Sequence, residues 1–363
     1  MASSTSWTGI EDAMTPKPRW VHAAVLLCLG LLLSVALLHA PGPVPGAKPM
    51  LGRALSGSAE AWPITPLPQA VVLDARKVAL GRQLFHDPRL SRDNTVACAN
   101  CHVLAAGGVD RQPVSTGIGG RKGQLNAPTV YNVAYNDRQF WDGRALSLEA
   151  QVDGPLHNPD EMGSNWDEVL GKLKEDAQLR REIEALYPAG LVAASLRDAL
   201  ATFERALVTP DAPFDRHLRG DQQALSPVAL EGWRLFRELG CVSCHQGVNV
   251  GGNLYEKLGL VEDFYGSRGT PRPADLGRYN LTRDDEHRYE FRVPPLRNVA
   301  LTAPYLHDGS VATLDEAVQI MARYQLGVRL KPREVQQLVA FLEALTGRPA
   351  PAAISGNIEA HTP

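Results

Sequence analysis

Apolar side chains recur with a spacing near 3.6 residues in several segments of the chain, which is the pattern of amphipathic helices. These segments are residues 71–85, 147–152, 166–186, 191–208, 226–239, 313–323 and 332–346. Long stretches rich in glycine and proline join them, and no convincing alternation of apolar and polar residues predicts a strand. The expected fold class is therefore all-α with long loops.

An uncharged apolar run lies near the N-terminus, at residues 23–38, with Lys17 and Arg19 just before it. Cations on the N-terminal side of an apolar run hold that end of the chain in the cytoplasm, and the chain after the run is directed across the membrane. The run is long for the core of a signal peptide and short for a membrane-spanning helix unless it extends over residues 20–40. Residues 1–40 are therefore expected to be an inner-membrane anchor or, less favoured, a cleaved signal segment. In either case the body of the protein is expected to be exported: into the periplasm, anchored in the inner membrane, or secreted if the segment is cleaved.

The net charge excludes one class of partner. The chain has 363 residues and a formal net charge of −3. Nucleic-acid binding calls for clustered lysine and arginine, so no nucleic-acid partner is expected.

Four of the five cysteines belong to two Cys-x-x-Cys-His motifs, CANCH at residues 98–102 and CVSCH at 241–245. Paired zinc knuckles lie about 15–20 residues apart, which is far closer than these two motifs. Thioredoxin-like dithiols do not need a histidine after the second cysteine. Covalent attachment of c-type haem needs this arrangement, because two thiols bind the porphyrin vinyl groups and the next imidazole reaches the iron. The sequence therefore predicts two c-type haems, bound by Cys98, Cys101, Cys241 and Cys244, with His102 and His245 as proximal iron ligands.

The surroundings of the two motifs repeat. A Gly-x-x-Leu-Phe run starting at Gly81 or Gly232 precedes each motif, and residues 126–152 align without a gap on 292–318. Matching residues are Pro128 with Pro294, Asn132 with Asn298, Asp142 with Asp308 and Leu148 with Leu314. The chain therefore reads as two cytochrome c-like haem domains related by internal duplication. The expected boundaries are 1–40 for the anchor or signal, 41–68 for a Pro/Gly-rich linker, 69–220 and 221–348 for the haem domains, and 349–363 for a flexible tail.

The two halves differ where the sixth iron ligand would come from. Met321 stands in the predicted helix after the second repeat, and the aligned residue of the first half is Pro155, which cannot bind iron. A haem with ligands on both faces transfers electrons, whereas an open face binds a small oxidant. Met321 as a core residue, and Met162 as a ligand of the first haem, stay open as alternatives. Glu161 could serve as an acid–base group. From spacing alone, a charge in the first turn of the next helix is the favoured interpretation.

The motifs LGRQLFHDPRLS, CANCH, NAPTVYN, FWDGR, PDEMG, LRNVALTAPYLHDG and EAVQIM occur in this order. From Leu80 to Gly347 the chain resembles the bacterial di-haem cytochrome c peroxidases. The resemblance implies that the first haem reduces hydrogen peroxide. It implies that the second haem, with Met321 as a ligand, receives electrons from a small cytochrome c or a cupredoxin. It further implies a homodimer.

The resemblance also assigns roles to particular residues. Glu161 matches the distal acid–base carboxylate, while Gln151 and Pro155 match other residues of the distal pocket. Trp141 matches the electron relay between the haems, and His307 is expected to be structural near a haem. A calcium ion is implied at positions matching Asn126, Thr302 and Pro304, where oxygen donors suit calcium.

The sequence departs from the pattern of this family at one position, and it leaves two alternative functions open. Many members close the resting peroxidatic haem with a loop histidine, and here that position is Ile118, which cannot bind iron. We therefore expect activity without prior reduction. The first alternative is the similar di-haem enzyme that matures methylamine dehydrogenase by oxidising tryptophan in a partner protein; it carries tyrosine in place of Met321. The second is a plain di-haem electron carrier, in which both irons have two protein ligands.

Overall fold

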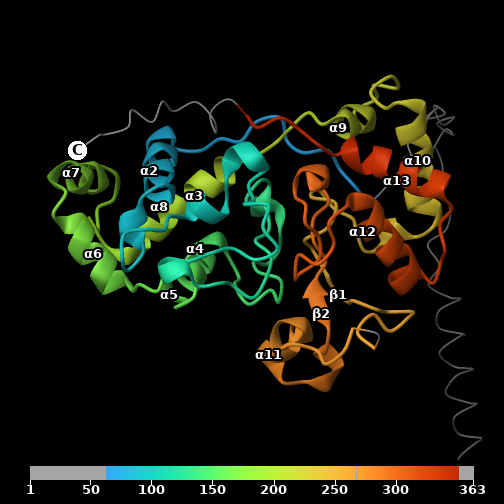
Figure 1. The fold of residues 1–363 in the computed structure, drawn as a ribbon. Helices are drawn as coiled ribbons and strands as arrows, with labels where there is room; N and C mark the ends of the chain where they lie inside the picture. Colours follow the sequence, from blue (N-terminus) through green and yellow to red (C-terminus); the bar gives the residue numbers. More distant parts are fainter. Residues whose placement is uncertain (1–62, 267, 351–363) are drawn as a thin grey trace, which may run out of the picture. The chain divides into compact units, whose positions relative to one another are not determined.

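The computed structural model describes residues 63–266 and 268–350 (Figure 1). The expected anchor or signal segment, most of the expected linker and most of the expected tail lie outside these residues. Across residues 63–266 and 268–350, no helix combines the length and the hydropathy needed to cross a bilayer.

The described chain is mostly helical. Its α-helices are α2 (Ala75–Phe85), α3 (Cys98–Cys101), α4 (Leu148–Gln151), α5 (Asp153–His157), α6 (Trp166–Lys174), α7 (Ala177–Leu186), α8 (Ala193–Ala206), α9 (Pro213–Leu218), α10 (Pro227–Glu238), α11 (Tyr279–Thr282), α12 (Leu314–Ile320) and α13 (Pro332–Glu343). A π-helical turn, Met321–Gln325, continues α12. Strands β1 (Tyr255–Lys257) and β2 (Glu290–Arg292) pair antiparallel, with Tyr255 opposite Arg292.

Helix boundaries follow capping chemistry, because the first backbone N–H groups of a helix need acceptors. The hydroxyl of Ser226 accepts a hydrogen bond from the backbone N–H of Ala229 at 3.1 Å, and Pro227 opens α10. Gly240 follows the helix in the left-handed region with φ of +92°. Thr313 caps α12 in the same way as Ser226 caps α10. These start and stop positions confirm the sequence prediction.

Two sequence predictions about elements need correction. The helix expected over residues 166–186 is two helices, because the carboxylate of Asp176 accepts from the backbone N–H of Leu179 at 3.0 Å and starts α7 afresh. The fold is also not purely helical, since β1 and β2 form a small sheet. Strands of three residues carry too little alternation to be recognised in a sequence.

Each half contains one close helix pair: α2 packs against α8, and α10 packs against α13 (Figure 1). Gly81 and Gly232 make the two contacts possible. A Cβ atom on Gly81 would overlap the carbonyl of Ala199, and one on Gly232 would overlap the carbonyl of Gln337. The two Gly-x-x-Leu-Phe runs therefore share a structural role, which is close contact between two helix backbones.

Replacing Gly232 with alanine is expected to destabilise the protein by about 1–3 kcal/mol or more, because the new methyl group has no room and α10 must move away from α13. Thermal unfolding of the holoprotein measures this loss. Gly171→Ala is the matched control. No atom lies within 4 Å of a Cβ at that exposed helical position, so alanine should there be neutral or stabilising. Equal melting temperatures for wild type and Gly232→Ala would contradict the packing argument.

The aligned loops repeat their backbone geometry at an interval of 166 residues. Asn132 and Asn298 both adopt left-handed conformations, with φ of 60° and 61°. An isolated bridge between Gln139 and Ala145 recurs as one between Tyr305 and Val311. The gapless sequence alignment therefore corresponds to equivalent local structure in the two halves.

Hydrogen bonds of the two aligned asparagines meet at one residue. The side-chain amides of Asn132 and Asn298 donate to the hydroxyl of Thr209 at 2.8 and 2.9 Å, and all three residues are buried. Thr209 lies in the segment between α8 and α9. This network ties the equivalent loops of the two halves together.

Two hydrophobic clusters form the cores. One contains Phe85 and Phe203 of the N-terminal half, and the other contains Trp233 and Phe341 of the C-terminal half. Ile64 and Leu67, which were expected at the end of a linker, are buried, and Ile64 belongs to the second cluster. The segment just before residue 68 is thus packed against the C-terminal half.

Candidate active site and haem sites

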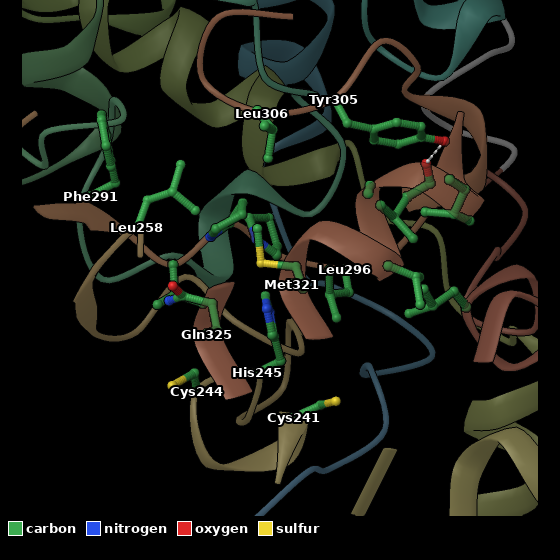
Figure 2. Close-up of a pocket in the computed structure, with 18 of the residues that line it drawn as sticks. Cys241, Cys244, His245, Leu258, Phe291, Leu296, Tyr305, Leu306, Met321 and Gln325 are labelled. Carbon is green, nitrogen blue, oxygen red and sulfur yellow. Dashed lines mark hydrogen bonds between the residues drawn. The ribbon is translucent and has the colours of Figure 1, made fainter. Parts of the chain in front are cut away.

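The second Cys-x-x-Cys-His motif opens onto a cavity of about 250 Å³. Cys241, Cys244 and His245 line it together with Met321, and most of the other lining side chains are apolar. Both cysteines are free thiols. Figure 2 shows the imidazole of His245 and the thioether of Met321 directed into the same space from separate segments. The structure thus brings the four predicted haem-binding residues of this half together.

His245 is held in the form that binds metals. Burial lowers the pKa of its imidazole from 6.5 to about 4, so the ring is neutral at physiological pH. Within the part of the chain that the structure describes, its buried Nδ1 has no hydrogen-bond partner. A neutral imidazole is a common metal ligand.

Met321 begins the π-helical turn that continues α12. Single π-helical turns inside α-helices often occur at functional sites, because they redirect a side chain. Two thiols, an imidazole and a thioether around an apolar cavity fit a covalently attached haem with two axial ligands. In the remaining lining, polar and charged side chains are few.

The first motif lies in α3 and the residue after it. Burial raises the pKa of the Cys98 thiol to about 12. Nδ1 of His102 lies 3.3 Å from the carbonyl oxygen of Gly108, a geometry that suits donation from Nδ1 and leaves Nε2 free for a metal. Burial also lowers the pKa of His102, while the Gly108 carbonyl opposes this shift. Cys98, Cys101 and His102 are therefore suited to bind the other covalent haem, which is the first haem in chain order.

At the position that aligns with Met321, the first half has no methionine. Pro155 stands 166 residues before Met321, within α5, and Gln151 ends α4. Met162, the alternative ligand, is buried in the hydrophobic cluster of the N-terminal half with Leu156 and Ile118. That environment is typical of a core methionine.

Glu161 lies in the turn between α5 and α6. Its carboxylate accepts a hydrogen bond from the side-chain amide of Asn158 at 2.7 Å. Burial raises the pKa of Glu161 above its ordinary value, and the bond from Asn158 opposes that rise. The pKa of Cys101 is raised chiefly by burial, and the charge of Glu161 adds to it. A half-buried carboxylate thus lies near the thiol that would hold the first haem.

The loop that contains Ile118 is fastened to the turn of Glu161. The backbone N–H of Ile118 donates to the carbonyl of Glu161 at 2.8 Å. The guanidinium of Arg121 donates to the carbonyl of Pro159 at 3.3 Å. The Ile118 side chain is buried and lies over Gly163, where a Cβ would collide with it. The side chain at this loop position is therefore packed into the core.

Trp141 lies in the part of the chain between the two Cys-x-x-Cys-His motifs. Its indole N–H donates to the carbonyl of Asn126 at 2.9 Å, and its ring borders the second cavity. Pro128 borders the same cavity, while its carbonyl also acts on the pKa of His102. Residues 126–129 and Trp141 thus connect the surroundings of the two histidines.

The residues proposed for calcium line the second cavity. Asn126, Thr302 and Pro304 all belong to its wall. The side-chain amide nitrogen of Asn126 donates to the carbonyl of Gln112 at 3.0 Å, so the amide oxygen is not used in this bond. The hydroxyl of Thr302 donates to the carbonyl of Val299 at 3.1 Å. The three residues offer neutral oxygen donors, as calcium can use.

His307 is buried beside these residues. Its Nε2 lies 2.7 Å from a carboxylate oxygen of Asp275, and its ring stacks on Phe291 with centroids 4.6 Å apart. Asp308 pairs with Arg268 at 2.7 Å. The sequence motif around His307 indicated this residue but not Asp275, because the local pattern around residue 275 does not reveal a partner 32 residues away.

Two Cys-x-x-Cys-His motifs, each packed against its own helical core, and Met321 in the cavity of the second motif define a di-haem c-type cytochrome. A family model described as di-haem cytochrome c peroxidase matches residues 75–223. The cytochrome c peroxidase Ccp of Escherichia coli (strain K12) is 50% identical over 286 residues, which are 78% of this chain and 61% of that protein. The cytochrome c551 peroxidase of Nitrosomonas europaea is 42% identical over 286 residues, covering 78% of this chain and 84% of the relative.

A crystal structure of a MauG-like protein associated with microbial copper homeostasis superimposes with a TM-score of 0.68 at 28% identity, covering 83% of this chain and 96% of that one. The chain belongs to the di-haem cytochrome c peroxidase family. It spans less than two thirds of the length of the Escherichia coli relative.

Proposed function

We propose that this chain is a cytochrome c peroxidase, which reduces hydrogen peroxide to water with electrons taken one at a time from a small redox protein. The observation that carries the proposal is the inequality of the two sites. Met321 borders the cavity of Cys241, Cys244 and His245, whereas Pro155 takes the equivalent place in the first half and Glu161 lies close to it in the chain. One site is thus built for electron transfer and the other for a small oxidant.

The second site receives electrons. His245 and Met321 would hold its haem iron, and this pair of ligands would give the haem a raised reduction potential. A small cytochrome c or a cupredoxin is the proposed donor. The low net charge of −3 fits a protein–protein partner better than a polyanion.

The first site binds peroxide. Cys98, Cys101 and His102 would hold a haem there, and this group would supply the electrons for peroxide reduction. Reduction of one peroxide molecule consumes two electrons and two protons, breaks the O–O bond and releases two water molecules. Glu161 accepts a proton from one oxygen of the peroxide and returns it to the other oxygen, which departs as water. This general acid–base work is typically worth about 10²–10⁴-fold in rate. Gln151 and Pro155 shape the pocket around the bound peroxide.

Trp141 is the proposed electron relay between the sites. Its position against the second cavity, on a segment that continues to Pro128 beside His102, supports this role. Asn126, Thr302 and Pro304 are proposed to hold one calcium ion next to this segment. The ion would stiffen the wall on which the relay depends.

The proposal extends to the organisation of the protein. We infer two haem domains, 69–220 and 221–348, that arose by internal duplication, an inference supported by the repeated loop geometry. A homodimer in the periplasm, attached to the inner membrane through residues 20–40, completes the proposal.

The experiment that tests the proposal uses the full chain with both haems attached. The oxidation of a reduced small cytochrome c is followed after hydrogen peroxide is added. Two donor molecules should be oxidised for each peroxide consumed. A plain di-haem electron carrier would leave peroxide unconsumed, and this outcome would overturn the proposal. An enzyme that oxidises tryptophan in a partner protein is disfavoured because Met321 stands where that enzyme has tyrosine.

Ile118 predicts a specific kinetic property. Because an alkyl side chain at this position cannot bind iron, the fully oxidised enzyme is expected to react at once. Its initial rate of peroxide consumption should match that of enzyme reduced at the second haem beforehand. Stopped-flow traces of both preparations measure this. A lag that disappears after prior reduction, or spectra of a bis-histidine first haem in the oxidised protein, would contradict the prediction.

A further inference from the structure

Arg292, the last residue of β2, is a buried cation whose guanidinium is only partly hydrogen-bonded. It is 4% exposed. Its Nε donates to the carbonyl of Phe140 at 3.1 Å, and its buried Nη1 has no hydrogen-bond partner in residues 63–266 and 268–350. Burial lowers its pKa from 12.5 to about 10. A buried arginine is normally paired with an anion, because an uncompensated charge is costly in the interior.

Arg297 shows what such a pairing looks like in the same chain. It is 1% exposed, and its two terminal nitrogens lie 3.0 and 2.8 Å from the carboxylate oxygens of Asp215. Its Nε donates to the carbonyl of Val248 at 2.6 Å. Arg292 has a similar contact to a backbone carbonyl, but no carboxylate of the described residues is paired with it.

The carboxylates on the segments next to Arg292 are engaged elsewhere. Asp142 pairs with Arg144 at 3.0 Å, and Glu290, on the same strand, pairs with Arg278 at 2.9 Å. Glu256, on the paired strand, lines the same cavity, but its carboxylate accepts from the backbone N–H of Lys257 at 2.9 Å and does not act on the pKa of Arg292. Among the described residues, no carboxylate is thus paired with Arg292.

The position of Arg292 indicates where its counter-ion comes from. It lines the cavity of His245 and Met321, and it is the one lysine or arginine among the described residues of that lining. Its backbone N–H also donates to the carbonyl of Trp141 at 2.8 Å, so the guanidinium is anchored beside the proposed relay. Any haem in this cavity brings two propionate carboxylates with it.

We propose that Arg292 is the binding site for a propionate carboxylate of the second haem, whose edge it fixes next to Trp141. The pairing has two consequences. The pairing orients the porphyrin toward Trp141. The positive charge of Arg292 disfavours the ferric state and so raises the reduction potential of this haem. The inference rests on haem being bound at the second site and does not depend on peroxide reduction.

The test compares holoproteins carrying Arg292→Gln, Arg292→Lys or the control Arg278→Gln, which removes a partly exposed arginine near the same strand. Resonance Raman bands of the propionates and redox titration of each haem are measured. Arg292→Gln should shift the propionate bands and lower the potential of the second haem alone. Arg292→Lys should shift the bands but keep most of the potential, because lysine retains the charge and loses the planar fork. Arg278→Gln should change neither.

Wild-type propionate bands and an unchanged potential in Arg292→Gln would overturn the proposal. If Arg292→Gln does not retain the second haem, Arg292→Lys decides the matter. A shifted propionate band in that variant supports the pairing, and an unshifted band rejects it. None of these measurements uses peroxide, so a failure of the proposed enzymatic function would leave the result interpretable.

Discussion

Glu161→Gln is expected to lower kcat/KM for hydrogen peroxide by about 10²–10⁴-fold, the usual contribution of a positioned acid–base group. Glutamine has nearly the same shape but cannot accept and return a proton. Both haems should remain attached, with unchanged potentials. Steady-state peroxide consumption with a reduced small cytochrome c measures the effect.

The matched control is Asp160→Asn, which removes the neighbouring carboxylate of the same turn. Asp160 is partly exposed and lies 3.8 Å from Arg121, so its loss should leave turnover within a few-fold of wild type. The pH profile gives a second readout. Glu161 must be ionised to accept a proton, and burial raises its pKa. The wild-type rate should therefore fall as pH drops through that raised pKa, and the Gln variant should lose this limb. Unchanged turnover in Glu161→Gln would contradict the acid–base role.

Met321→Ala is expected to remove a ligand from the second haem and lower its potential, by roughly a tenth to a third of the ~0.8 V range over which axial ligands set haem potentials. Donor oxidation should slow accordingly, since the second haem would then be a poorer electron acceptor. Peroxide or cyanide binding at the first haem should be preserved. Potentiometric titration followed by absorption spectroscopy measures the change.

Met162→Leu is the control for this variant. Met162 is 4% exposed within the N-terminal cluster, and a volume-conserving replacement there should cost less than about 1.5 kcal/mol. Spectra of both haems should be unaffected, because a core methionine binds no iron. A second haem with wild-type spectrum and potential in Met321→Ala would show that Met321 is not a ligand. A change at the first haem in Met162→Leu would show that this haem is closed.

Sequence patterns predicted those features that depend on neighbours in the chain. The caps at Ser226 and Thr313 are local, and the structure places both as expected. The haem motifs are equally local, and the 166-residue interval between equivalent loops could be read from the alignment alone. Met321 could be predicted to face the second haem because the helix that contains it follows the repeat, and the helical periodicity fixes which side chains lie on one face.

Features that depend on distant contacts left no such pattern. The break at Asp176 comes from one side chain that competes with the helix for a backbone N–H. Ile64 and Leu67 follow a stretch rich in proline and glycine, yet they are buried. The importance of Arg292 depends on its Nη1, which has no hydrogen-bond partner among the described residues although Nε has one. Its sequence neighbours, Phe291 and Val293, give no hint of this. The hydrogen bond between Asn298 and Thr209, which are 89 residues apart, likewise could not be predicted from the local sequence.

The central claim is that the two irons are unequal in the oxidised protein, and titration with cyanide tests it most directly. The absorption and magnetic spectra of both haems are followed as cyanide is added to the fully oxidised holoprotein. We expect one cyanide to bind per chain, at the haem of His102, while the haem of His245 and Met321 keeps its spectrum. Binding of no cyanide, or of one at each haem, would contradict the account.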